Sequence, residues 1–269
     1  MKRSNGLIAA GTVLSLVATL DMLLSPESVS LIDLVLRMSY VGTSFEFPSL
    51  FNMTFRLFPL FAFQAIMGNS YYDYFCTGSV YYFSRCQLRK KWLAKKQFEL
   101  LLASILYSAF LLVPSLLILI MQQRLMLSRI AWTITGYYVA IFSLWLFITT
   151  TTINFLSLKI KEVASYAFVI GSQLLLVMAL KFCEPENGAA ARLLSINPIA
   201  HLILSWHNSP ISEVDFYIHQ IETGISLNDS VAFFLGLSSV AVFVSIFIVS
   251  AGNHFFKYRN RGGINGAYC

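Results

Sequence analysis

The sequence lacks the residue patterns that identify the commonest hydrolytic and metal-dependent sites. It contains no G-x-x-x-x-G-K-[ST] phosphate-binding loop, no G-x-S-x-G nucleophile turn and no H-E-x-x-H zinc pair. His201, His207 and His219 share one stretch, but spacings of six and twelve residues do not place them on one helical face, so we interpret them as surface or interfacial histidines. The four cysteines are widely separated: Cys76, Cys86, Cys183 and Cys269. We expect free thiols, no catalytic residue, no metal and no cofactor bound by the chain itself.

The segment 68–97 is the part of the chain richest in side chains suited to binding a partner. The aromatic residues of its first half are Tyr71, Tyr72, Tyr74, Phe75, Tyr81, Tyr82 and Phe83. The basic residues of its second half are Arg85, Arg89, Lys90, Lys91, Lys95 and Lys96. Contact with headgroups and anionic lipid explains the basic half. It does not explain seven rings in a short loop, which are typical of the core of a protein–protein interface.

Asp21 and Arg56 are ionisable residues that fall inside apolar runs. A charged side chain near the centre of a membrane helix costs roughly 2.5–3.5 kcal/mol, so such residues are candidates for function. Their expected depths differ by roughly 9 Å, and an arginine side chain reaches across much of that distance. We therefore predict an ion pair between Asp21 and Arg56 that joins the first two spans, with contact to a substrate as the alternative.

These residues must be positioned by helices that cross a membrane. Of the 269 residues, 57% are hydrophobic and 12% are charged, whereas soluble domains have about 25% charged residues. A membrane helix needs roughly 20 apolar residues. Six runs have about this length: Gly6–Leu24, Phe47–Met67, Phe98–Met121, Ile130–Phe155, Val163–Leu180 and Val231–Ala251. The sequence therefore predicts an all-α integral membrane protein with six transmembrane helices in a single domain, residues 1–269.

Positive charge is unevenly divided between the two sides of this predicted bundle. Thirteen Lys and Arg residues fall on the side that holds both termini and five on the other, so we predict that both termini are cytoplasmic. The net charge of +6 lies in short loops beside the membrane, which favours contact with anionic lipid over nucleic acid. Lys2 and Arg3 also fit a secretory signal, but no clear A-x-A cleavage site follows, so we expect a retained first span.

The segment 181–230 contains a second apolar feature on the predicted external side. Its run Leu193–Trp206 (LLSINPIAHLILSW) has fourteen residues, too few to cross a membrane. We expect a re-entrant or interfacial helix with Pro198 in its first turn. A helix lying flat on the outer leaflet is the alternative.

The pattern of segment 68–107 resembles a known family. It comprises Gly78, Arg85, the run Arg89-Lys90-x-Trp92-x-x-x-Lys96, and a following apolar helix with Ser104 and Tyr107. This pattern is similar to the first cytoplasmic loop of bacterial ABC exporter permeases of the type-2 class, particularly small Firmicute members linked to bacteriocin or lantibiotic export and immunity. The six-span order and Asn197-Pro198 in the external segment are similar too. The chain departs from many members in having only five residues before the first span, which leaves no room for an amphipathic N-terminal helix.

The resemblance implies a permease subunit in the bacterial cytoplasmic membrane. Such subunits pair with a second permease, a copy or a relative, and bind separate ATPase subunits, which hold ATP and magnesium. It implies that the ATPase docks on the aromatic and basic residues of segment 71–92, and that Asn197 and Pro198 belong to an external gate. Peptide or other amphipathic cargo is implied, and membrane lipids are further partners. An ATP-independent transporter, and an integral membrane enzyme or assembly protein, are the alternatives.

Overall fold

The structure is a computed structural model that describes residues 2–25, 27–41, 45–72, 89–182, 188–221 and 223–259, and it is mostly helical. The longest helices are α1 (Lys2–Leu24), α7 (Arg89–Phe110), α9 (Arg129–Ser157), α10 (Glu162–Ala179) and α13 (Leu227–Arg259). The shorter helices are α2 (Leu31–Ser39), α3 (Phe47–Arg56), α4 (Phe58–Met67), α5 (Ser70–Tyr72), α8 (Val113–Met121), α11 (Gly188–Ile196) and α12 (Ser212–Ile218). The 3-10 turns are η2 (Leu180–Phe182) and η3 (Ala200–Leu202). Short parallel strands pair β1 (Val29–Ser30) with β2 (Leu125–Met126), and β3 (His207–Asn208) with β4 (Ile225–Ser226).

Four to five helical stretches within the described residues are long and apolar enough to cross a membrane. Four are continuous: Lys91–Met121, Arg129–Ser157, Glu162–Phe182 and Leu227–Phe247. A fifth consists of α3 and α4, which meet at a bend of 41°. In α1, the apolar stretch Gly11–Leu24 is shorter than these membrane-spanning lengths. The helical architecture and four to five helices able to cross a membrane are therefore observed, whereas the predicted number of six spans and the side of the termini remain predictions.

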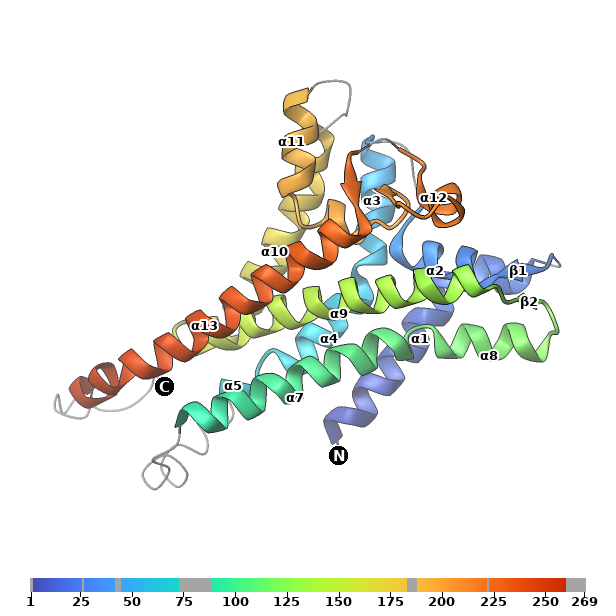
Figure 1. Cartoon of the computed structure of the whole chain (residues 1–269). Coiled ribbons are helices and arrows are strands. Elements are labelled where there is room, and N and C mark those ends of the chain that lie inside the picture. The colour runs from blue at the N-terminus through green and yellow to red at the C-terminus, as the bar shows by residue number, and fades with distance from the viewer. Residues whose placement is uncertain are drawn as a thin grey trace.

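Helix α9 is the centre of the bundle. It lies between α7 and α13 and also packs against α10 and α4 (Figure 1). Two thirds of its apolar stretch is buried, compared with 39% or less in the other continuous spans. The helix begins after Ser128, whose hydroxyl accepts a hydrogen bond from the backbone N–H of Ala131 at 3.1 Å. Residues on α9 are therefore the best placed to connect the other spans.

The second predicted span is broken at Leu57. Pro59 lies in the first turn of α4, where its missing N–H removes a backbone donor and its ring disfavours an α conformation in the residue before it. The N–H of Leu57 bonds to the carbonyl of Thr54 at 3.0 Å, which tightens the end of α3. The bend thus follows directly from the sequence Leu57-Phe58-Pro59.

The loops after α1 and α8 are joined to each other. Val29 pairs with Leu125 across β1 and β2. The guanidinium of Arg124 donates to the carbonyl of Glu27 at 2.8 Å and to the carbonyls of Leu23 and Met22, both at 3.2 Å. Arg124 therefore supplies donors to the unpaired carbonyls at the end of α1, a favourable place for a cation.

The predicted external helix Leu193–Trp206 is not a single helix. α11 ends at Ile196, Asn197 and Pro198 form a turn, and η3 follows. Proline cannot continue an α-helix because it lacks the N–H and clashes with the preceding turn, so the placement of Pro198 inside a helical first turn is wrong. Most of the run after Asn197, including Trp206, is buried in a compact core.

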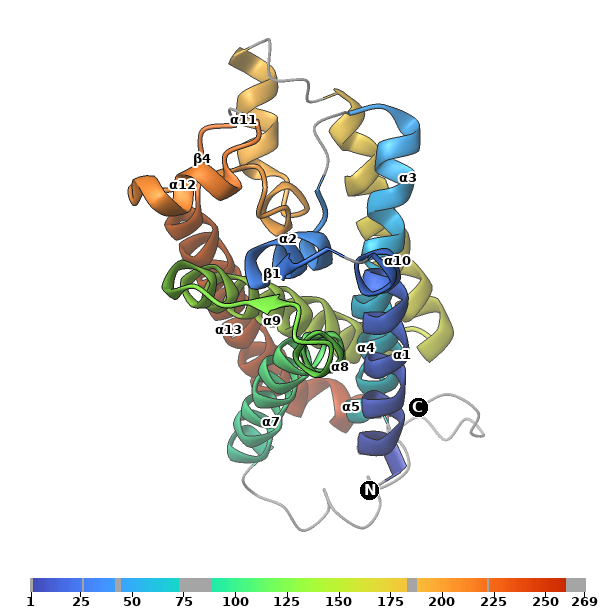
Figure 2. The ribbon, with the colours of Figure 1, turned by 90° about the vertical axis from the view of Figure 1, so that its right-hand side faces the viewer.

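Helix α2 completes this core. It packs against both α1 and α9 (Figure 2), and Leu31, Leu34 and Val35 are fully buried. Its start is fixed by a reciprocal cap between Ser30 and Asp33. The ring of Phe45, after α2, lies 4.9 Å from that of Trp206, so apolar side chains tie the segment after α1 to the segment before α13.

Candidate functional site

The residues predicted to bind an ATPase lie mostly outside the described residues. The predicted residues that lie outside the described ranges are Tyr74, Phe75, Gly78, Tyr81, Tyr82, Phe83 and Arg85. The described structure contains both ends of this loop, Tyr72 on one side and the start of α7 at Arg89 on the other. The two ends lie close together, because the rings of Tyr71 and Trp92 are 6.1 Å apart.

Tyr71 is buried and does not present a binding surface. Its ring has 1% exposure and meets Phe155 of α9 edge-on at 5.5 Å. The prediction that Tyr71 contacts a partner ATPase is therefore wrong for this structure. An aromatic residue beside a span can face the bundle as well as a partner, and the sequence pattern does not distinguish the two. Trp92 is half-buried beside it.

Asn154 of α9 fastens the start of this loop. Its amide nitrogen donates to the carbonyl of Met67 at 3.0 Å, and its amide oxygen accepts from the N–H of Tyr71 at 2.8 Å and the hydroxyl of Ser70 at 3.0 Å. Gly68 allows the close approach, because a Cβ there would lie 2.7 Å from Ile153. The buried amide of Asn154 thus forms hydrogen bonds with the backbone where α4 ends. The sequence pattern did not predict this role. An asparagine inside an apolar run was its only signal.

A second polar network crosses the interior between α4, α9 and α10. Gln64 and Gln173 exchange amide hydrogen bonds of 3.0 and 3.3 Å. Gln64 also donates to the hydroxyl of Thr149 at 2.8 Å, and the indole of Trp145 donates to Gln173 at 3.2 Å. All four side chains are buried. Polar side chains between membrane helices hold them by hydrogen bonds.

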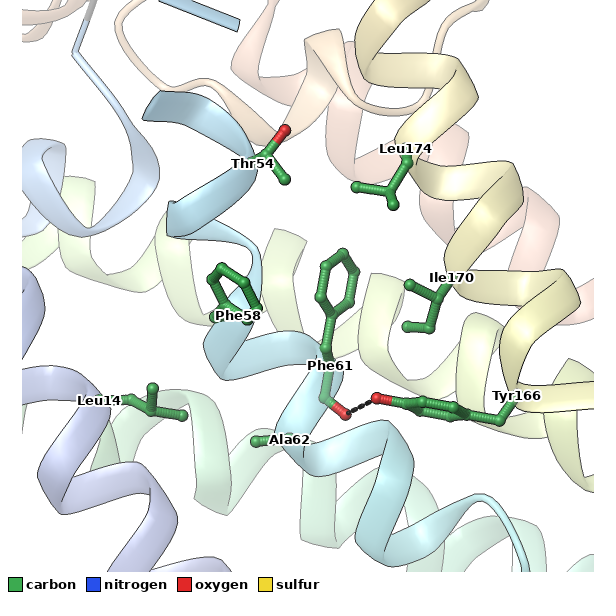
Figure 3. Close-up of a pocket in the computed structure, with 8 residues that line it drawn as sticks. All are labelled: Leu14, Thr54, Phe58, Phe61, Ala62, Tyr166, Ile170 and Leu174. Atoms are coloured by element: carbon green, nitrogen blue, oxygen red, sulfur yellow. Dashed lines mark hydrogen bonds between the residues drawn. The ribbon is translucent and has the colours of Figure 1, made fainter. Parts of the chain in front are cut away.

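An apolar groove of about 420 Å³ lies between α4 and α10 (Figure 3). The residues that line it are Leu14, Thr54, Phe58, Phe61, Ala62, Tyr166, Ile170 and Leu174. The hydroxyl of Tyr166 is not free for a ligand, since it donates to the carbonyl of Phe61 at 3.2 Å. The bend at Leu57 borders the groove, so movement of α3 against α4 would change its shape. The groove can accept an alkyl chain or an apolar side chain.

The predicted ion pair between Asp21 and Arg56 is wrong. Asp21 pairs with Arg37 of α2, and Arg56 donates instead to the backbone carbonyl of Ala18 at 2.5 Å. Local sequence patterns do not indicate that α2 packs against α1 and brings a closer cation to Asp21. Arg56 therefore joins α3 to α1, the helices in which the first two spans were predicted, but through a main-chain acceptor.

Asn197 fastens the external segment to α10. Its side-chain nitrogen donates to the carbonyl of Leu176 at 2.9 Å, and its oxygen accepts from the N–H of Ile199 at 2.9 Å. The predicted gate residues Asn197 and Pro198 therefore form the turn after α11. Whether this turn gates a path remains a prediction.

Two histidines of segment 181–230 are buried side by side. Ser230 of α13 lies between them, with its hydroxyl oxygen 2.7 Å from Nδ1 of His201 and 2.7 Å from Nε2 of His207. Burial lowers the pKa of both imidazoles, that of His207 to about 4. The interpretation of His201 and His207 as surface or interfacial residues is wrong, because both are in the core of the external segment. His219 is partly exposed and pairs with Asp215.

No group of three or more potential metal ligands occurs among the described residues. Comparison of the sequence with protein-family models, with curated proteins and with solved structures finds no match.

Proposed function

We propose that the chain is the transmembrane subunit of an ATP-driven exporter that moves a peptide or another amphipathic molecule across the bacterial cytoplasmic membrane. A separate ATPase supplies the energy, and a second permease subunit completes the path. A bundle of apolar helices and a sequence without a phosphate-binding loop suit this role. The proposal includes six spans, with α1 as the first, and cytoplasmic termini.

The observation that carries the proposal is the way the two ends of loop 73–88 are held. Tyr71 and Trp92 lie together against α9, and Asn154 of α9 binds the backbone just before the loop. A partner that pulls or tilts this loop acts on the central helix of the bundle and on α7 directly. This arrangement is what a permease needs to receive movement from an ATPase.

The groove between α4 and α10 supports the choice of amphipathic cargo. Its lining is apolar except for the hydroxyl groups of Thr54 and Tyr166. The hydroxyl of Tyr166 is already hydrogen-bonded within the chain. A sugar or an ion would lose its hydration there without gaining hydrogen bonds. An apolar side chain or an alkyl chain has no hydrogen bonds with water to lose on entering the groove.

The experiment is affinity purification of the tagged chain from its native membrane, followed by identification of co-purified proteins and assay of ATP hydrolysis. We expect a soluble ATPase to accompany the chain, and no hydrolysis by the chain alone. Replacing both Tyr74 and Phe75 by Ala should release the ATPase, because loss of central aromatic anchors often costs about 2 kcal/mol or more.

Phe98→Ala is the matched control, since Phe98 is 67% exposed on α7 outside the loop. It should leave the ATPase bound. Retained binding in the Tyr74 and Phe75 double variant would place the interface elsewhere on the chain. Hydrolysis by the pure chain, or the repeated absence of any ATPase, would reject the proposed function and favour an ATP-independent transporter.

A further inference from the structure

His201, Ser230 and His207 form an unbroken chain of short polar contacts inside the external segment. Each side chain is buried, with at most 3% exposure. The outer nitrogens of the two rings are also engaged: Nε2 of His201 lies 2.8 Å from the carbonyl of Ser195, and Nδ1 of His207 lies 2.9 Å from the carbonyl of Ile203. The chain therefore runs from one carbonyl to another through two imidazoles and one hydroxyl.

The number of protons in this chain can be counted. A carbonyl only accepts, so Nε2 of His201 and Nδ1 of His207 must each carry a proton. In a neutral imidazole the other nitrogen is then a bare acceptor. Both bare nitrogens face the oxygen of Ser230, which has only one proton to donate. With two neutral rings, one of the two 2.7 Å contacts therefore brings two lone pairs together.

One additional proton removes this conflict, and His201 is the better ring to hold it. His201 stacks on Phe233 with centroids 4.5 Å apart and planes 9° apart, so its positive charge would lie over the face of an aromatic ring. The carbonyl of Ser195 and the charge of Asp229 raise its pKa against the effect of burial. His207 is more deeply buried and remains the neutral acceptor.

The other ionisable groups on the surrounding elements do not supply the hydrogen-bond donor that is missing between the two rings. Asp229 on α13 acts on both rings through its charge. On α12, Asp215 and His219 lie 3.6 Å apart and pair with each other. On α9, the hydroxyl of Tyr137 donates to Asn228 at 2.7 Å. On α11, Arg192 is exposed.

We propose that His201, Ser230 and His207 form a binding site for one proton, which fastens the external segment to α13. In the bound state, His201 donates to Ser195 and Ser230, and the Ser230 hydroxyl donates to His207. When the proton leaves, one contact must lengthen, and the attachment of the segment to α13 loosens. The inference does not depend on the proposed transport function.

The test is nitrogen NMR of the full chain labelled with [15N]histidine, because the chemical shifts of Nδ1 and Nε2 distinguish imidazolium from each neutral tautomer. The chain has four histidines, so the spectrum is simple, and His219→Gln and His254→Gln assign the other two. At pH 5 we expect His201 as imidazolium and His207, whose pKa is about 4, as the neutral form with the proton on Nδ1. Two neutral rings at pH 5, or the opposite tautomer of His207, would overturn the proposal.

Two variants test the sharing of the proton. Ser230→Ala removes the acceptor of His201, and the pKa of His201 should fall by about one pH unit or more, as expected for loss of a hydrogen bond to a charged group. In His207→Gln, an amide N–H can donate to Ser230, whose hydroxyl then serves neutral His201, so the imidazolium signal at pH 5 should disappear. His219→Gln is the matched control and should leave His201 unchanged. Persistence of the signal in His207→Gln would show that His201 holds its charge independently.

Discussion

The paired amides of Gln64 and Gln173 form a closed exchange of hydrogen bonds in the interior. Removing one amide leaves the polar atoms of the other without their partner, which costs about 1–3 kcal/mol. Removing both leaves neither amide without its partner, and only the indole N–H of Trp145 loses its acceptor. We therefore predict that Gln64→Leu and Gln173→Leu each lower the thermal unfolding midpoint, whereas the double variant recovers part of the loss. Thermal unfolding of the four proteins in one detergent gives the coupling energy directly.

An additive double variant would contradict this prediction, because it would show that the two amides contribute independently. Leu175→Ala provides a comparison on the same helix, since Leu175 is 72% exposed. Its effect should be small and should add to that of either glutamine variant.

His207 gives the external segment a defined acid limit. Burial lowers its pKa from 6.5 to about 4, so between these values the unfolded chain binds a proton that the folded chain does not. The stabilisation is complete above pH 6.5 and is lost as the pH falls toward 4. We predict that the unfolding midpoint of the chain declines below about pH 6 and that His207→Gln reduces this decline. A decline of equal size in His207→Gln would assign the acid sensitivity to other groups.

Sequence patterns located several of the important residues but not their partners. Arg56 was expected to join the first two spans, and it joins α3 to α1 through the carbonyl of Ala18. Asp21 was assigned the wrong cation because Arg37 belongs to a buried helix that hydropathy does not identify. Asn154 was overlooked, since a single amide in an apolar run carries no periodic signal. Which side chains meet depends on the rotation of each helix about its axis, and a chain that is apolar on all faces does not specify that rotation.

At the scale of elements, α7 is the helix that follows segment 73–88. Trp92 stands near its start against Tyr71, so it fixes the position of the helix relative to the preceding span. We predict that Trp92→Ala lowers the ratio of cargo moved to ATP consumed severalfold while the ATPase stays bound. Transport and hydrolysis measured together in reconstituted vesicles give this ratio. If the ratio keeps its original value, Trp92 has no coupling role and acts only as an interfacial aromatic residue.

The groove between α4 and α10 can be filled from one of its own walls. Ala62 lines it, and Ala62→Trp would place an indole in the space proposed for cargo. We predict strongly reduced transport with little change in ATPase binding and a change in stability below about 1 kcal/mol, because the indole enters open space and not a packed core. Leu117→Trp is the control, because it introduces the same indole on α8 at a side chain that is 55% exposed. Equal transport by the two variants would exclude the groove from the cargo path.

Hydropathy predicted the long elements well and the short ones poorly. The runs after Phe98 all correspond to helices of membrane-spanning length, because an apolar helix satisfies its own backbone wherever it lies. The helix α2 and the turn at Asn197–Pro198 depend on packing with distant segments, and local sequence does not report that packing. The bend at Leu57 had a local signal in Pro59 that the count of apolar residues ignored.

At the scale of the whole molecule, Arg124 connects the first span to the loop between α8 and α9. Arg124→Gln removes most of the donors that serve the carbonyls of Leu23, Met22 and Glu27. We predict a loss of about 1–3 kcal/mol in the free energy of unfolding, as for other charge-assisted hydrogen bonds. Arg129→Gln, at an exposed position nearby, is the control. Equal unfolding midpoints for the two variants would mean that water serves these carbonyls equally well.

The same arginine has a consequence for biosynthesis. The carbonyls at the end of α1 receive their donors from a residue about one hundred positions later, and β1 has no partner until β2 is made. During synthesis, the end of α1 therefore lacks these donors until residues 124–126 are made, although its contacts with α2 and α4 can form earlier. A nascent chain that stops before residue 124 should leave α1 extractable and sensitive to protease, and extension past residue 126 should secure it.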